Sequence, residues 1–97
     1  MYEINLLPTA QEDLNALRKF QQKEVLDGIK TQLRYEPTVE TRNRKRLDPN
    51  DLAEWELRVG KFRVFYNVET EALIVRVEAI GVKDGNLLFI RDRRVDL

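Results

Sequence analysis

The chain of 97 residues contains neither cysteine nor histidine. The lack of cysteine excludes disulfides, zinc–thiolate sites and thiol nucleophiles. The lack of histidine removes the side chain that most often acts as a general acid or base and as a metal ligand. Serine is also absent, which makes a Ser-His-Asp triad impossible. Any catalysis must therefore use carboxylates, lysine, arginine, tyrosine, threonine or backbone groups.

An excess of charge of either sign is missing too, because 17 lysines and arginines balance 17 aspartates and glutamates. This balance argues against a polycation that coats nucleic acid, although it permits a local basic patch. No apolar run reaches the ~20 residues that span a bilayer, and the N-terminus does not have the pattern of a signal peptide. With 42% hydrophobic residues, residues 1–97 are expected to form one domain that is soluble, cytoplasmic and without a membrane partner.

The first half of the chain predicts a strand followed by two helices. Apolar residues alternate with polar ones over residues 2–7, which is typical of a half-buried strand. Thr9 and Glu12 have the spacing of a capping box, which predicts that a helix starts there. A second helical pattern extends over residues 20–34 and ends before a proline. So short a join between two helices predicts a helical hairpin.

The second half predicts three strands in quick succession after a polar loop. Alternating apolar residues place these strands near 53–59, 62–68 and 72–80, so they should form an antiparallel meander. The sequence therefore predicts an α+β fold in the order β-α-α-β-β-β, with an antiparallel sheet of about four strands and the helical hairpin on one face. Residues 87–90 fit either a last strand turn or a helix start, and residues 91–97 form a charged tail. The residues expected to be buried are Leu14, Leu17, Leu26, Ile29, Leu33, Trp55, Leu57, Val64 and Val75.

The sheet face opposite the helices should carry one arginine from each of the three predicted strands, namely Arg58, Arg63 and Arg76. Guanidinium groups held close together bind phosphate or carboxylate through bidentate hydrogen bonds. Three glutamates share this face, so the charges could instead pair with one another on a solvated surface. Both interpretations stay open at this point. The glutamates are Glu54, Glu56 and Glu78, and Phe65 is expected on the same face.

A basic run in the polar loop at 37–50 could contact phosphates or simply be solvated. Its cations are Arg42, Arg44, Lys45 and Arg46. Three carboxylates follow in and after the turn, but their spacing is not that of an EF-hand, so they are interpreted as turn residues. They are Asp48, Asp51 and Glu54. No metal site and no cofactor are predicted.

The segment Trp-x-Leu-Arg-Val-Gly-x-Phe-Arg-Val-Phe-Tyr at residues 55–66 is the most distinctive motif, and Val-Glu-Ala-Ile-Gly at residues 77–81 ends the predicted meander. Together with the opening strand and the first helix, these motifs resemble the RelE/ParE superfamily of toxins from bacterial toxin–antitoxin modules. The resemblance covers about residues 2–90. In that superfamily the RelE branch cleaves mRNA in the ribosomal A site, whereas the ParE branch poisons DNA gyrase and is not a nuclease. An antitoxin from the same operon neutralises either kind of toxin.

The resemblance implies a metal-independent endoribonuclease in which the ribose 2′-hydroxyl attacks the adjacent phosphate. Arg63 matches the arginine that grips the scissile phosphate, and Arg58 and Lys83 match basic positions that support it. Arg76 and the cations of the basic run are candidate substrate-binding residues. The first expectation is thus a toxin that cleaves ribosome-bound mRNA, represses translation and pairs with a cognate antitoxin.

Two positions depart from the RelE pattern. Glu56 stands where these nucleases often have a second lysine, and a carboxylate there would repel a phosphate. Phe89 falls near the place of a C-terminal tyrosine that assists proton transfer, which phenylalanine cannot do. These departures support the alternative of a non-enzymatic DNA gyrase inhibitor, or of a homologue that has lost toxicity.

Overall fold

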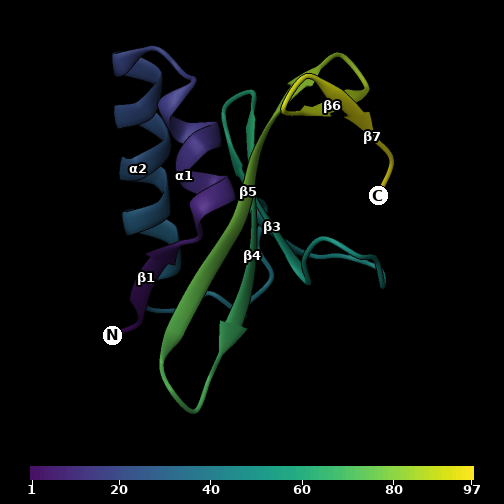
Figure 1. The fold of residues 1–97 in the computed structure, drawn as a ribbon. Helices are drawn as coiled ribbons and strands as arrows, with labels where there is room; N and C mark the ends of the chain where they lie inside the picture. Colours follow the sequence, from purple (N-terminus) through teal and green to yellow (C-terminus); the bar gives the residue numbers. More distant parts are fainter.

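Two helices cover one face of a curled β-sheet in the computed structural model, which describes all 97 residues (Figure 1). Helix α1 (Pro8–Asn15) and helix α2 (Lys19–Leu33) form the expected hairpin. Both lie on the same side of the sheet (Figure 1). The α+β class and the helical hairpin on one face are therefore confirmed. Neither helix is long and apolar enough to cross a membrane.

The sheet has seven strands rather than about four. Six of them follow one another as antiparallel neighbours in the order β2-β3-β4-β5-β6-β7, while β1 pairs with β5 in parallel. The basic run supplies the additional strand β2, and the C-terminal residues supply β6 and β7. The strands are β1 (Glu3–Leu6), β2 (Arg44–Arg46), β3 (Trp55–Val59), β4 (Phe62–Glu69), β5 (Ile74–Asp84), β6 (Leu87–Ile90) and β7 (Arg93–Val95).

The predicted capping box at the first helix is wrong. The helix begins two residues earlier than a Thr9 N-cap implies, with Pro8 in its first turn and Leu7 as the N-cap, and no side chain caps it. Proline suits this place because its fixed φ matches the helix and its missing N–H would have no partner there. The Thr9 hydroxyl instead donates a hydrogen bond of 2.9 Å to the carbonyl of Glu78. Thr9 thus joins the helix to the sheet.

The larger hydrophobic core lies between the helices and the sheet. Apolar residues at helical spacing on α2 pack against alternating apolar residues of the central strands. The two elements come so close that a Cβ at Gly28 would lie 2.7 Å from Val59 Cγ2, and glycine permits this approach. Leu17 and Leu26 are partly buried. The other expected core residues are buried, namely Leu14, Ile29, Leu33, Trp55, Leu57, Val64 and Val75.

The opposite face of the sheet, here called the second face, is not open as the sequence suggested. It carries a smaller second core, in which the Phe65 side chain is completely buried. The segment between β2 and β3 and the β6–β7 hairpin curl over this face from two sides (Figure 1). The second core consists of Ala53, Phe65, Ala79, Leu88 and Ile90, with Leu47, Leu52 and Val95 packed against it.

A β-bulge in β5 places Val77 and Ala79, two residues apart, in different cores. Phe65 pairs with Ala79 of β5, whereas Tyr66 pairs with Val77, so Glu78 is the extra residue of the bulge. Val77 therefore faces the larger core with Tyr66, and Ala79 faces the second core with Phe65. Because a core covers each face of the sheet, the whole beginning of β4 is buried, which alternation with one covered face does not predict.

The predicted charged tail is folded, because residues 91–95 form the turn and the second strand of the β6–β7 hairpin. Its two turn residues, Arg91 and Asp92, have φ values of 51° and 62°, which match a two-residue type I′ turn. Gly81 does not end its strand as expected but lies inside β5. A Cβ on Gly81 would lie 2.9 Å from the carbonyl oxygen of Phe89, so glycine lets β6 approach β5.

A buried carboxylate fastens the hairpin to the first helix. Asp13 on α1 accepts hydrogen bonds of 2.9 Å at both carboxylate oxygens from Arg91 Nη1, and a 3.0 Å bond from the backbone N–H of Ile80. The side chain of Asp13 is 3% exposed. This contact joins three segments that are far apart in the sequence, and nothing in the sequence analysis predicted it.

Tyr66 should cause the free energy of unfolding to fall as the pH becomes alkaline. Its buried hydroxyl donates a 2.7 Å hydrogen bond to the Pro37 carbonyl, and burial raises the pKa of Tyr66 above its usual value, against a smaller lowering by Arg44. The folded state therefore holds this proton more tightly than the unfolded chain. The contribution is complete below about pH 10, the usual tyrosine pKa, and is lost as the pH rises further.

The measurement is chemical denaturation of the wild type and Tyr66→Phe between pH 7 and 11. At pH 7 the variant should lose ~1 kcal/mol, the worth of one hydrogen bond. Above pH ~10 the difference between the two proteins should shrink, because only the wild type still has the tyrosine to ionise. Parallel curves across the whole range would show that Tyr66 is not the titrating group.

Candidate functional site at the basic end of the sheet

The strand register brings the three predicted catalytic cations to one end of the second face. Arg58 of β3 lies directly opposite Arg63 of β4. Arg63 lies opposite Gly81 of β5, and Lys83, two residues further along, has its side chain on the same face. Arg58 is exposed and Lys83 is half-buried. The sequence thus predicted correctly that Arg58 and Arg63 share a face, whereas it predicted no face for Lys83, and the catalytic role of all three stays a prediction.

The Arg63 guanidinium is buried and forms hydrogen bonds within the protein. The residue is 8% exposed, and its Nη1 donates hydrogen bonds of 2.8 Å to the carbonyl groups of Gly60 and Phe62. Its Nε has no hydrogen-bond partner and lies 3.5 Å from Glu56 Oε1. The predicted open position of Arg63 is therefore wrong, because the second core and the β3–β4 turn enclose it.

Glu56 provides the countercharge for this buried cation. Burial lowers the pKa of Arg63, the nearby charge of Arg58 lowers it further, and Glu56 raises it. An arginine keeps its proton in proteins, so its burial is tolerable only beside an anion. The alternative in which a glutamate of this face pairs with an arginine is thus confirmed for Glu56 and Arg63.

Arg76 lies far from Arg58 and Arg63 on the second face. In the ladder it pairs with Asn67, five residues along β5 from Gly81, which is about 17 Å in an extended strand. It forms an ion pair with Glu69, and this hydrogen bond and charge raise the pKa of Arg76. The expectation that Arg76 flanks Arg63 is wrong, because β5 is longer than the alternation indicated.

The basic run is divided between structural and exposed positions. The Arg44 guanidinium is buried and donates hydrogen bonds to the carbonyl groups of Gln32 (2.8 Å) and Val39 (2.9 Å). It therefore fastens the end of α2 to β2. The loop predicted at this place is a strand, since Arg44–Arg46 pairs with β3.

The other three cations of the run are exposed. Lys45 lies opposite Glu56 in the ladder and extends the cationic group across the second face. Arg46 is paired with Glu54 at 3.1 Å. Arg42 precedes β2. Of the predicted substrate-binding residues, only Lys45 is brought next to the Arg63 site by the strand register.

The residue near the predicted tyrosine position is on the wrong face for proton transfer at Arg63. Phe89 pairs with Val82, whose side chain packs against the larger core on the helix side. Phe89 also lines a pocket of ≈ 560 Å³ together with residues of α1. Two of the three tyrosines, Tyr2 and Tyr66, belong to or pack on the larger core, and Tyr35 follows α2. The second face therefore offers Lys45, Glu56 and Lys83, and no tyrosine, as proton-transfer groups.

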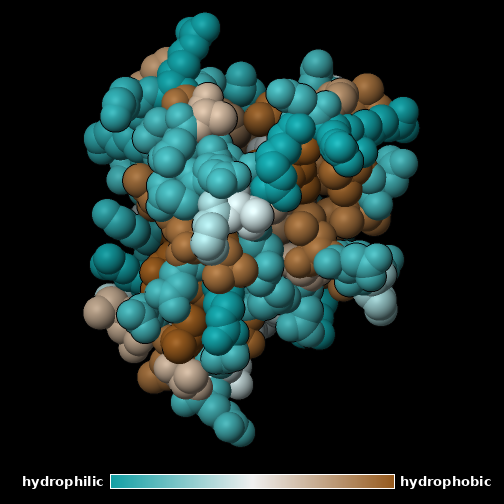
Figure 2. Space-filling view, in the orientation of Figure 1, coloured by the Kyte–Doolittle hydropathy of each residue, from teal (hydrophilic) through white to brown (hydrophobic).

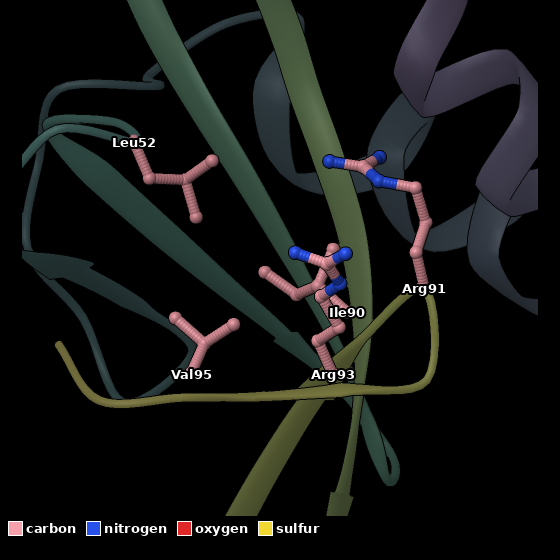
Figure 3. Close-up of a pocket in the computed structure, with 5 residues that line it drawn as sticks. All are labelled: Leu52, Ile90, Arg91, Arg93 and Val95. Carbon is pink, nitrogen blue, oxygen red and sulfur yellow. The ribbon is translucent and has the colours of Figure 1, made fainter.

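A second pocket, here called the groove, opens on the second face beside the C-terminal hairpin. It has a volume of ≈ 470 Å³. Figure 2 shows hydrophobic residues gathered on this side of the molecule, between hydrophilic regions above and below. Figure 3 shows the Leu52 and Val95 side chains pointing toward the same space, with the Arg93 side chain beside it. The lining residues are Leu52, Ile90, Arg91, Arg93 and Val95. The sequence does not predict this groove, because residues 91–97 have the composition of a charged tail.

Replacement of Arg63 by alanine should lower the free energy of unfolding by about 1–3 kcal/mol, since a buried charged donor to two carbonyl groups is lost and Glu56 keeps its charge. The same replacement at Arg76, which is half-buried and pairs with Glu69 at the surface, should leave stability nearly unchanged. Urea unfolding of the two variants provides the comparison. Equal stability of both variants would show that Arg63 is on an open surface after all.

Two solved structures are similar to this fold. The RelBE2 toxin–antitoxin complex from Mycobacterium tuberculosis matches with a TM-score of 0.73 and 23% identity, covering 84% of this chain and 98% of that one. The archaeal RelE–RelB complex from Pyrococcus horikoshii matches with a TM-score of 0.68 and 20% identity, covering 88% and 97%. The fold is therefore that of the RelE class of toxins. No curated protein matches the sequence.

The family model for the ParE toxin of the type II toxin–antitoxin system parDE matches residues 4–83. Because this match spans most of the chain, the protein belongs to that family and is the toxin component of a type II toxin–antitoxin system. The resemblance to the RelE/ParE superfamily is thus confirmed. The matched residues end within β5, so the β6–β7 hairpin lies outside them.

Proposed function

We propose that this toxin stops growth by binding DNA gyrase, without cleaving RNA, and that a cognate antitoxin keeps it inactive in the cytoplasm. The main evidence for this proposal is that the Arg63 guanidinium is already bound by groups of the protein. A guanidinium that grips a scissile phosphate must present free donors to it. Here Nη1 is used by two backbone carbonyl groups, and the Glu56 carboxylate occupies the anion position at 3.5 Å from Nε.

Two further observations support a toxin that is not a nuclease. The second core fills the centre of the face on which RNA would lie, so a nucleotide would meet apolar side chains there. The second face also has no tyrosine and the chain no histidine, which leaves few groups to protonate a leaving oxygen. The match to the ParE family model agrees with this proposal.

The antitoxin partner is proposed from the family and from the solved relatives. Both similar structures are complexes of a toxin with its antitoxin. An antitoxin segment that folds on contact could cover apolar surface that the toxin leaves exposed. Because the genes of such a pair are adjacent, we expect a small reading frame beside this gene to encode the partner.

Pulse labelling in cells tests this function. After induction of the toxin, incorporation of labelled thymidine should stop before incorporation of labelled methionine, because gyrase is needed for replication. Co-expression of the neighbouring small gene should restore growth. A first arrest in methionine incorporation would contradict the gyrase target, and a failure of the neighbouring gene to restore growth would contradict the antitoxin assignment.

Ribosome-dependent mRNA cleavage is the second candidate, because the register does place Arg58, Arg63 and Lys83 together. In this case Arg63 would hold the scissile phosphate, with Arg58 and Lys83 in support. Cleavage of ribosome-bound mRNA by the wild type, its loss in Arg63→Ala and its increase in Glu56→Lys are the results that this candidate requires. No cleavage by any of these proteins, provided that each is folded, would exclude it.

A further inference from the structure

The sheet ends at β7, whose outer edge has no neighbouring strand. The strand order places β7 at one end of the sheet and β2 at the other. Because the sheet curls, the segment after β2 and strand β7 meet across the second core, where Leu52 and Val95 both pack. The groove lies between them, open to solvent beside the free edge (Figure 3). A free edge above an apolar groove is the surface on which an extended peptide adds a strand.

The charges of the groove are of one sign. Its two charged lining residues are Arg91 and Arg93, and no carboxylate lines it. Arg91 is partly neutralised by Asp13, but Arg93 is exposed and forms no ion pair. Ile90 and Arg93 are opposite each other in the hairpin, so the Arg93 side chain projects on the same side as the apolar Ile90. An occupant should therefore carry apolar side chains next to carboxylates.

We propose that the groove and the β7 edge bind an extended acidic and apolar segment of the cognate antitoxin, which adds an eighth strand to the sheet. The inference rests on the proposed function only for the existence of the antitoxin. The hairpin lies outside the residues that the ParE family model matches. An antitoxin that binds there would contact a part of this toxin that lies beyond the matched residues.

The backbone geometry of the hairpin identifies the groups that would receive the added strand. In a two-residue hairpin the pair that flanks the turn exchanges hydrogen bonds, and the next pair does not. Ile90 and Arg93 flank the turn, and Phe89 and Arg94 are the next pair. The N–H and C=O of Arg94 therefore point away from β6 toward the free edge.

Two variants separate the side-chain and backbone parts of this contact. Arg93→Glu reverses the charge of the groove and should weaken binding at least ~10-fold, because it sets like charges against each other. Arg94→Pro removes the outward N–H without disturbing the bonds to β6, and should weaken binding about 3- to 10-fold. Arg94→Ala is the matched control, since it keeps the N–H. Lys23→Glu, on the exposed face of α2, is the control for charge reversal.

The probe is the purified product of the small gene next to this one, and its dissociation constant for each folded variant is measured by calorimetry. Hydrogen exchange of the complex adds a second measurement, in which the amide of Arg94 should become protected when the partner binds. Weakened binding by Arg93→Glu and Arg94→Pro, unchanged binding by both controls and protection of Arg94 are the expected results. Tight binding by all variants with an unprotected Arg94 would overturn the inference while keeping the antitoxin. A wild type that does not bind the probe would overturn the antitoxin assignment, and the inference with it.

Discussion

Replacement of Phe65 by alanine should lower the free energy of unfolding by about 3–5 kcal/mol, the range for removing a fully buried aromatic side chain. Phe65 has no exposed surface and fills the middle of the second core. The segment after β2 and the β6–β7 hairpin both rest on it, so its loss leaves a cavity that neither can close without moving. The hairpin should also loosen, because Leu88 and Ile90 lose a packing partner.

Denaturant unfolding of Phe65→Ala measures the effect, with Phe20→Ala as the control. Phe20 is 66% exposed, so its replacement should change stability by no more than about 0.5 kcal/mol. Hydrogen exchange should in addition show faster exchange of the β6 and β7 amides in Phe65→Ala. A loss of stability as small as that of Phe20→Ala would mean that the second face is the open surface that the alternation of the sequence suggested.

Replacement of Asp13 by alanine should cost about 2–4 kcal/mol. Removal of one partner of a buried ion pair costs about 3–5 kcal/mol, and the lower range applies here because the Arg91 side chain is 45% exposed. The variant also leaves the buried N–H of Ile80 without an acceptor. Asp13→Asn should lose less, since an amide oxygen can still accept from Ile80.

A double-mutant cycle with Arg91→Ala apportions this loss. The two replacements should be non-additive, because each removes the same contact between α1 and the hairpin. Glu12→Ala, at the exposed neighbouring position on α1, is the control and should be nearly neutral. Fully additive effects of Asp13→Ala and Arg91→Ala would show that the two side chains do not interact in solution.

Local patterns were sufficient for the helical hairpin and the central meander. The helical spacing of apolar residues on α2 and the alternation in β3 and β4 reflect burial against a single large core. Each pattern lies within one short segment, so it can be recognised without knowledge of the remainder of the chain. The turn at Gly60, with φ of 56°, follows the same logic because glycine accepts that conformation readily.

The elements that were missed depend on partners far away in the sequence. The β6–β7 turn contains Arg91 and Asp92 in place of the Asn-Gly that is typical of a type I′ turn. The hydrogen bond between Arg91 and Asp13 joins residues that are 78 positions apart. Strand β2 is polar, so only its pairing with β3 makes it a strand. The bulge at Glu78 moves the alternation of β5 from one face to the other, which no local pattern reveals.

The candidate site was predicted in part for the same reason. Alternation placed Arg58 and Arg63 on one face, and the register confirms that they are neighbours. Alternation does not say whether a face is covered, so the burial of Arg63 and its contact with Glu56 could not be foreseen. The second core that encloses Arg63 is assembled from the chain end and a loop, both of which the sequence presents as polar segments.

We propose that this toxin acts by binding gyrase and not by cutting RNA. The supercoiling of relaxed plasmid by purified gyrase, as folded toxin is added, tests this target directly. Supercoiling should fall with increasing toxin, the product of the neighbouring gene should restore it, and folded Arg76→Ala should inhibit as the wild type does. Full supercoiling at a large excess of folded toxin would show that gyrase is not the target.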